Sequence, residues 1–533
     1  MVTVGGLLDG HVSLDLECMD RNYLNGYVPN LQVAGQVVSF MTEHMRCPIP
    51  SPALMEKIGT RFRSSVKAFA DSLGVPVVPF AKGDRKIEVM RPLMDAQART
   101  GRSGVVAVGV AQEFQNVFAS AKRQTSTGAP CFSFFKADRR VSCYYFYLWD
   151  DDFGPAFIKV CAYFPYPVKV WVNGHEWAKR QAVHAGIEYT QLSNGFASCA
   201  DPTGLQNLCD RLGPQNIQAF FDCWMARLPL PLDDYDRACG YWWELSMRQV
   251  EVSRTMVFDA PRNARAFFEA LVADNLDVGR PDSVELIFTG PHPKGRRPIL
   301  GCQPKTKIVT RDTDVTVNAF FKHSRIKQYL KDGRALRIET VVNSPTDLCC
   351  KRRLEHLDQL QGKARDINRR LLDTERAGQG CVLASPAFER IAMPSVNPDG
   401  RRAPALRFGD PRVMALLGAL CATLHTIGFT HRSLRARVTK LLGGSYTTNQ
   451  MSYDLARLRL NGLIERLPHT NTYLLTDDGI RAAVFYTKVH NRVLRPLLAA
   501  DRPPAPPELR EALATINRHV SAYTDTARLP KAA

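Results

Sequence analysis

The sequence predicts an α+β protein of several domains, with mixed or antiparallel sheets, packed helices and a distinct helical segment near its carboxyl end. Its 533 residues are more than a single hydrophobic core usually holds. Runs with the alternation of strands and runs with the periodicity of helices both recur along the chain. Because 45% of the residues are hydrophobic, each part has enough apolar side chains to form a core.

Four parts follow from composition and periodicity. Residues 1–235 form an N-terminal α+β domain, and residues 236–395 form a second one that contains a hairpin at 322–343 and a basic helix at 351–376. A helical domain spans residues 405–500, and residues 501–533 are a Pro-rich linker with a final helix.

The helical segment has an ordered set of elements. Helices are predicted at 411–425, 432–442 and 447–460, and two short strands follow at 463–466 and 472–476. Thr447 or Thr448 would cap the third helix, and Gly462 stands where a C-terminal glycine belongs. This order of elements predicts a winged helix-turn-helix, with the turn at 467–471 as the wing.

One face of the third helix carries groups that suit nucleic acid. Its buried stripe is Met451, Leu455 and Leu458. Amide, phenol and guanidinium groups lie about half a turn away, and such groups read base edges and hold phosphates. The candidate contacts on the helix and the wing are Asn449, Gln450, Tyr453, Arg457, Arg466, His469 and Asn471. The run "YDLARLRLNGLIERL…NTYLLTDDGI" resembles bacterial winged-helix regulators; such a domain binds DNA or RNA, or serves protein contacts instead.

Bulk properties agree with an anionic partner inside the cell. The formal net charge is +18 and the pI about 9.4, which favours nucleic acid, although a genome rich in Arg codons gives the same excess. The fourteen cysteines show no metal or disulfide spacing, which suits a reducing cytoplasm. No signal peptide or membrane span is expected, so we predict a cytoplasmic protein without a membrane partner.

An acidic turn in the first domain is one candidate site. Asp150, Asp151 and Asp152 follow an aromatic strand, and Lys159 lies on the returning strand. Carboxylates beside a lysine could hold Mg²⁺ or Mn²⁺ for phosphodiester chemistry. The alternative is a solvated turn, because Asp and Gly are common in turns.

The hairpin at 322–343 permits a prediction of register. A three-residue loop of Lys331, Asp332 and Gly333 would pair Ile326 with Ile338 and Arg325 with Glu339. This register places the apolar side chains on one face. The opposite face carries the polar residues Arg325, Lys327, Tyr329, Arg337 and Glu339.

That polar face is the second candidate site. Arg325, Lys327 and Arg337 could hold phosphates, Glu339 could bind a metal, and Tyr329 could attack a phosphate. The alternative is an outward face held by an Arg325–Glu339 pair.

Two resemblances involve this hairpin. "YLKDGRALRIET" resembles a hairpin of rolling-circle replication initiators, although their His-hydrophobic-His metal motif is absent here. The whole chain, through "DDDFGPAFIKVCAYFPYPVKVWVNGHEWAKRQ" and "KQYLKDGRALRIET", resembles a widespread family of uncharacterised bacterial proteins. In the segment "GHEWAKRQ", a helix begins that carries His175, Lys179 and Arg180 in its first turns. This helix either binds an anion or is a surface helix.

Three functions remain open at this stage. We expect a nucleic-acid-binding protein, with duplex DNA as the expected ligand. The first alternative is a metal-dependent enzyme that nicks or transfers DNA strands for a mobile or replicating element. The second is a scaffold for protein assembly. The sequence has no P-loop, HExxH, GxSxG or zinc ligand set, which argues against NTPase, hydrolase and zinc-enzyme classes.

Overall fold

The computed structural model describes residues 8, 10–123, 131–274, 283–287, 305–311, 314–377, 386–396, 400–421, 428–496 and 506–526. The chain divides into two compact units. We call residues 11–264 and 322–368 the sheet unit, and residues 1–10, 265–321 and 369–533 the C-terminal unit. Each unit is described by itself.

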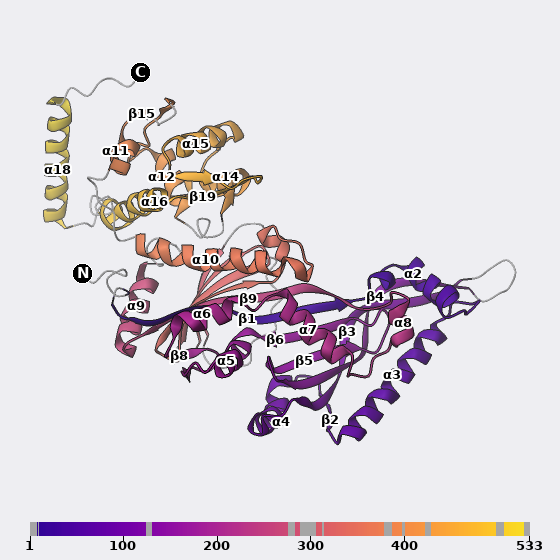
Figure 1. Cartoon of the computed structure of the whole chain (residues 1–533). Coiled ribbons are helices and arrows are strands. Elements are labelled where there is room, and N and C mark those ends of the chain that lie inside the picture. The colour runs from indigo at the N-terminus through magenta and orange to yellow at the C-terminus, as the bar shows by residue number, and fades with distance from the viewer. Residues whose placement is uncertain are drawn as a thin grey trace. The chain divides into compact units, whose positions relative to one another are not determined.

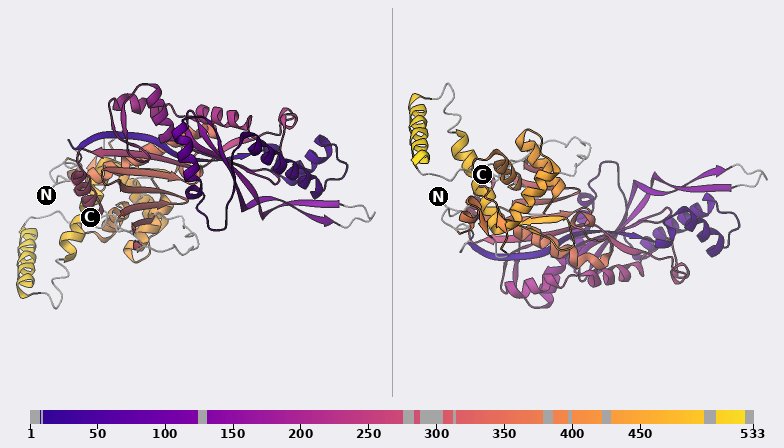
Figure 2. Two further views of the ribbon diagram at one scale, coloured as in Figure 1. Left: turned by 90° about the horizontal axis from the view of Figure 1, so that it is seen from below. Right: turned by 90° about the horizontal axis from the view of Figure 1, so that it is seen from above.

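The sheet unit is built on one large, mostly antiparallel sheet (Figures 1 and 2). Its strands run in the order β13-β14-β9-β1-β6-β5-β4-β3-β2, and only β2 and β3 are parallel. Their bounds are β1 Val12–Tyr27, β2 Val77–Pro79, β3 Gly104–Arg123, β4 Cys131–Asp150, β5 Gly154–Cys161, β6 Val168–Asn173, β9 Glu244–Phe258, β13 Ser324–Lys331 and β14 Ala335–Val342. Because β9 lies between β1 and β14, the boundary expected at residues 235 and 236 falls inside one sheet.

Helices and a small hairpin complete this unit. They are α2 Ala34–Ser39, α3 Pro52–Leu73, α4 Lys86–Thr100, α5 Gly174–His184, α6 Pro202–Asp210, α7 Pro214–Met225, α8 Asp234–Ala238 and α10 Leu357–Ala377, with strands β7 Tyr189–Gln191 and β8 Phe196–Cys199. The expected helix at 351–376 is confirmed in its main part, and Leu357, Leu360 and Ala364 lie in the core. On the face that α10 covers, the Asn368 amide donates to the Val252 carbonyl at 3.0 Å.

The hairpin of β13 and β14 has the predicted faces but a different register. Lys327 pairs with Glu339 and Arg325 with Val341, so the expected Arg325–Glu339 and Ile326–Ile338 pairs are wrong by two residues. Asp332 and Gly333 both have positive φ, at 48° and 65°, which makes a tight turn one residue later than expected. A slip of two residues preserves which side chains share a face, and alternation therefore could not exclude it.

The C-terminal unit contains the predicted order of helices and short strands. Its described elements include α11 Pro386–Ala392, α12 Pro411–Leu420, β17 Phe429–Thr430, α14 His431–Leu442, α15 Thr448–Leu460, β18 Ile464–Arg466, β19 Thr472–Leu475, α16 Asp477–Val489 and α18 Pro507–Thr526. The strands pair in the order β17-β19-β18. Residues 422–427, which include the end of the first predicted helix, lie outside the described residues, as do residues 497–505, which include the start of the predicted linker.

Local signals account for this segment. The Thr447 hydroxyl accepts a hydrogen bond from the backbone N–H of Gln450 at 3.2 Å, so the predicted cap is present. Gly462 has φ +70°, which favours glycine after the helix. Met451, Leu455 and Leu458 are buried in the core of this segment, as their spacing predicts.

Among the described residues, none of the helices combines the length and apolar character needed to cross a bilayer.

Candidate functional site

Three carboxylates meet on one face of the sheet unit. A β-bulge in β1 sets Asp20 and Arg21 opposite the single residue Glu251 of β9, because Met19 pairs with Val252 and Asn22 with Val250. Bulges re-aim side chains, and they are frequent beside functional sites. Glu339 comes from β14, where it pairs with Ser253, two residues along β9 from Glu251.

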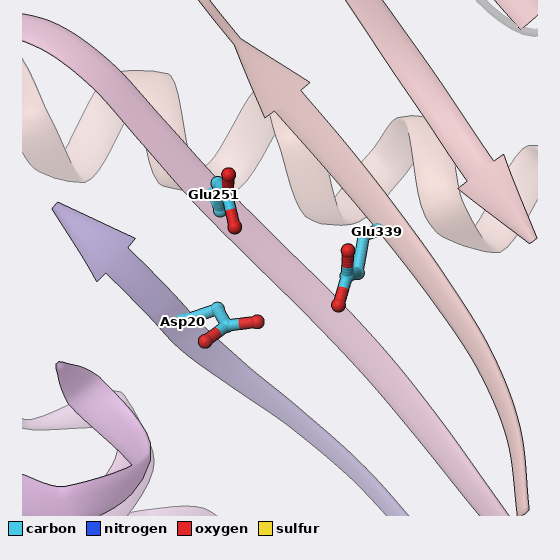
Figure 3. A group of neighbouring side chains, drawn as sticks. All are labelled: Asp20, Glu251 and Glu339. Atoms are coloured by element: carbon cyan, nitrogen blue, oxygen red, sulfur yellow. The ribbon is translucent and has the colours of Figure 1, made fainter. Parts of the chain in front are cut away.

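The carboxylates converge, as Figure 3 shows. Each of Asp20, Glu251 and Glu339 offers an oxygen that lies within 4.8 Å of the other two. Their exposed fractions are 0%, 4% and 1%. Three buried acids at such distances require cations nearby, because like charges in a low dielectric repel strongly.

The counter-charges are three cations. Arg337 is fully buried, and its guanidinium reaches Asp20 Oδ2 at 2.7 Å and Glu339 Oε1 at 3.0 Å. Lys327 Nζ lies 3.0 Å from Glu339 Oε2, and Arg21 Nε lies 3.4 Å from Glu251 Oε2. Of the three, Arg21 has the most exposed side chain, at 48%.

A loop and a helix terminus cover the Asp20 side of the cluster. Asn194 donates its amide N–H to Asp20 Oδ1 at 2.6 Å, and its backbone carbonyl accepts from Arg337 at 2.6 Å. His175 at the start of α5 contacts Ser253 Oγ at 3.0 Å and Arg337 at 2.7 Å. The preceding Gly174 passes so close to β1 that a Cβ there would lie 2.1 Å from the Met19 carbonyl oxygen.

Burial and charge shift the pKa values of two carboxyls in opposite directions. Burial raises the pKa of Glu251, and the more distant Arg21 and Lys327 do not reverse that effect. Burial also acts on Glu339, but Arg337 and Lys327 outweigh it and hold the pKa of that carboxyl below its ordinary value. Burial and the nearby Glu339 charge raise the pKa of Tyr329. Opposed shifts of neighbouring acids are a feature of acid–base sites.

The geometry leaves one carboxylate oxygen for an added ligand. Glu251 Oε1 accepts from Gln249 at 2.7 Å, whereas the buried Oε2 has no hydrogen-bond partner among the described residues. Among the described residues, Arg21 is the cation within ion-pair distance of this oxygen, and its side chain is 48% exposed. A hard divalent ion such as Mg²⁺ or Mn²⁺ takes oxygen ligands and would replace the Arg21 charge. Asp20, Glu251 and Glu339 are the residues that could hold it.

The structure joins three residues that the sequence singled out on the hairpin. Tyr329 Oη donates to Glu339 Oε1 at 2.7 Å, and Lys327 binds the other oxygen of the same carboxylate. Arg325 is half-buried on the same face of β13. Arg337, a predicted phosphate contact, lies away from the surface, because its guanidinium is fully buried and engaged by protein groups. The alternative of an outward face is also wrong, since Glu339 is buried.

The acidic turn is a separate place. Asp150 Oδ1 accepts from the backbone N–H groups of Asp152 and Phe153 at 3.0 and 2.9 Å, and Oδ2 accepts from the Trp224 indole at 2.7 Å. Those bonds hold the turn, while Asp151 and Asp152 are exposed. Lys159 does not join them: it pairs across strands with Tyr145, and its Nζ lies 2.6 Å from Glu113.

On α15 the predicted contact residues differ in access. Asn449 is exposed and Gln450 is half-buried. Tyr453 is 52% exposed, and the Arg412 guanidinium lies over its ring, 5.6 Å from the ring centroid. The Arg457 side chain is only 11% exposed. It contacts the Pro404 carbonyl at 3.4 Å and Asp454, so it stabilises the segment internally.

The wing residues remain at the surface. Arg466, His469 and Asn471 are exposed at the turn between β18 and β19. Arg466 donates to the Thr470 carbonyl and to Asn471 Oδ1, both at 2.8 Å, and so organises the turn. His469 has φ +56° in this turn.

Sequence reasoning missed Asp20, Glu251, Arg21 and Asn194. The available signal was a pair of opposite charges inside an apolar strand, "LECMDRNYL", and a glutamate within "QVEVSRT". A charge within a buried strand needs a partner, and that partner lies far away in the sequence.

No family model, curated protein or solved structure matches the chain.

Proposed function

We propose that the protein binds nucleic acid and that α15, in a winged helix-turn-helix, contacts duplex DNA. The exposed side of α15 supports this proposal: Asn449, Ser452, Tyr453 and Arg459 face away from the buried stripe. Residues 430–476 contain seven Lys and Arg against two acidic residues. A cationic surface with amide and phenol groups suits phosphates and base edges.

Duplex binding by the full chain tests the proposal. We expect anisotropy of a labelled duplex to show affinity that falls steeply from 50 to 200 mM salt. The double variant Asn449→Ala/Tyr453→Ala and the single variant Arg459→Gln should each weaken binding by about 5-fold or more. Arg211→Gln, an exposed arginine in the sheet unit, is the matched control. Equal affinity of all four proteins would remove α15 from the contact surface. Arg457→Ala is a poor probe, because that residue also supports the fold.

A second function is supported by the carboxylate cluster. We propose that Asp20, Glu251 and Glu339 hold a divalent metal ion for phosphodiester cleavage or strand transfer. Convergence of three carboxylates, with no hydrogen bond to Glu251 Oε2 from any described residue, carries this proposal. The metal would supply charge stabilisation at the phosphate.

The residues around the cluster fit that chemistry. Tyr329 Oη would form a bond to phosphorus while the bond to the leaving sugar oxygen breaks. The phenol proton passes to Glu339, which already accepts the Tyr329 hydrogen bond at 2.7 Å. The leaving oxygen takes a proton from water. Lys327 lies beside the same carboxylate and can contact the phosphate.

Cleavage of supercoiled plasmid with Mg²⁺ or Mn²⁺ tests this function. Tyr329→Phe keeps the ring and loses the hydroxyl, so we expect cleavage to fall at least ~100-fold and covalent protein–DNA adducts to disappear. Glu251→Gln should weaken Mn²⁺ binding measured by calorimetry. Asp71→Asn, at an exposed carboxylate on α3, is the control. Absence of both Mn²⁺ binding and cleavage in the folded wild type would refute the second function.

A further inference from the structure

Beside the carboxylate cluster, the same face of the sheet carries a row of aromatic rings. The register places Tyr23 opposite Trp171, Trp171 opposite Phe157, and Phe157 opposite Tyr147, on strands β1, β6, β5 and β4. Tyr23 follows Arg21 by two residues on β1, so this row is the next one along the strand from the cluster. Side chains two residues apart on a strand share a face and stand roughly 7 Å apart.

Part of this row is accessible. Tyr147 is buried, whereas Tyr23, Phe157 and Trp171 are half-buried. The Phe157 and Trp171 rings are parallel within 6° at 5.8 Å, and Tyr23 meets Phe157 edge-on at 6.0 Å. Neither the Tyr23 hydroxyl nor the Trp171 indole N–H has a hydrogen-bond partner among the described residues. We call Tyr23, Phe157 and Trp171 the ring platform.

The next row of side chains along the strands, two residues beyond the ring platform, contains cations. Lys169 lies opposite Asn25 on one side and Lys159 on the other. Lys169 Nζ donates to Asn25 Oδ1 at 2.5 Å, and the Arg248 guanidinium lies 5.4 Å from the Tyr23 ring centroid. In the part of the chain that the structure describes, neither Lys169 nor Arg248 has an ion-pair partner.

Glu113, a carboxylate whose charge acts on Lys169, is already engaged. Glu113 Oε2 lies 2.6 Å from Lys159, and Glu113 Oε1 lies 2.6 Å from Lys86. Lys159 and Lys169 are therefore cross-strand neighbours beside Arg248, and Glu113 is the carboxylate that neutralises Lys159. Such an arrangement is destabilising in the free protein, and an anionic ligand would relieve the repulsion.

We propose that the ring platform, with Lys169 and Arg248, binds single-stranded nucleic acid. Bases stack on Tyr23, Phe157 and Trp171, while Lys169 and Arg248 contact the phosphates. Rings next to cations are how proteins hold single strands without sequence preference. A duplex does not fit the same surface, because its bases are stacked on one another and turn no free face outward. The inference rests on the proposed phosphodiester chemistry, for which it names the substrate class.

Binding of a labelled oligothymidylate to the full chain tests the inference. Trp171→Leu removes a stacking ring and Lys169→Met removes a cation, while both keep an apolar side chain on the sheet. We expect each variant to weaken binding at least ~5-fold. For Trp171→Leu this is the lower end of the usual loss for one stacked base. Quenching of tryptophan fluorescence by the oligonucleotide should decrease in Trp171→Leu.

Two further variants separate this inference from the functions on which it depends. Glu251→Gln should lose cleavage and still bind the oligonucleotide, whereas Asn449→Ala/Tyr453→Ala should lose duplex affinity and keep single-strand affinity. Wild-type affinity of both Trp171→Leu and Lys169→Met would overturn the inference. Displacement of the oligonucleotide by unlabelled duplex as readily as by unlabelled single strand would overturn it too.

Discussion

Replacing Lys169 by Met should make the protein more stable. Burial, with the nearby charges of Arg248 and Lys159, lowers the pKa of Lys169 from 10.5 to about 7. Cys143 and Glu113 act in the opposite direction and do not offset them.

The size of the gain follows from that pKa. One pKa unit corresponds to about 1.4 kcal/mol, so keeping Lys169 charged in the folded state costs at most about 5 kcal/mol. Lys169 is half-buried, and screening by solvent reduces this figure to about 2–3 kcal/mol. Losing the hydrogen bond to Asn25 costs about 1 kcal/mol. We therefore expect Lys169→Met to raise the free energy of unfolding by about 1–2 kcal/mol at neutral pH.

The gain depends on pH with a defined sign. Because the folded pKa is depressed, the unfolded chain binds more protons between pH 7 and 10.5, and wild-type stability rises across that range. Below pH 7 Lys169 is charged in both the folded and the unfolded chain, so the full free-energy cost of burying its charge is present. The advantage of Lys169→Met should therefore be largest at pH 6.5 and shrink by pH 9.5.

Urea unfolding followed by tryptophan fluorescence measures this difference. All six tryptophans lie between residues 149 and 243, so the signal reports the sheet unit. Lys57→Met, an exposed lysine on α3, is the control and should change stability by less than ~0.5 kcal/mol. No gain at pH 6.5, or the same gain at pH 9.5, would refute the reasoning.

Three other predictions concern the same unit. Glu113→Gln should destabilise it by about 2–3 kcal/mol at pH 7, because burial raises the pKa of Glu113 but Lys159, Lys86 and Tyr145 outweigh it and lower the value to about 2. That loss, read from urea midpoints, should shrink as pH falls from 4.5 toward 2, and a constant loss would contradict the ion-pair account. Gly174→Ala should cost at least ~1 kcal/mol, measured by thermal unfolding, since its Cβ would collide with β1. Arg337→Met should cost more than Arg21→Met in the same assay, because it leaves buried carboxylates uncompensated; equal losses would count against that.

Locally encoded features were predictable from the sequence. The bounds of α15, the Thr447 cap and the positive φ of Gly462 follow from periodicity and from the few residues that suit those positions. The faces of the β13–β14 hairpin follow from alternation. Each of these depends on contacts within a few residues along the chain.

Tertiary structure decided the register and the site. Alternation has a period of two, so it could not separate the Lys327–Glu339 pairing from the expected Arg325–Glu339 pairing. Asp20, Glu251 and Glu339 meet only because β1, β9 and β14 are neighbours and a bulge turns Asp20 toward the others. Burial of Arg337 and Arg457 likewise depends on what packs over them. Pairing between distant strands is set by the whole core, and no local pattern encodes it.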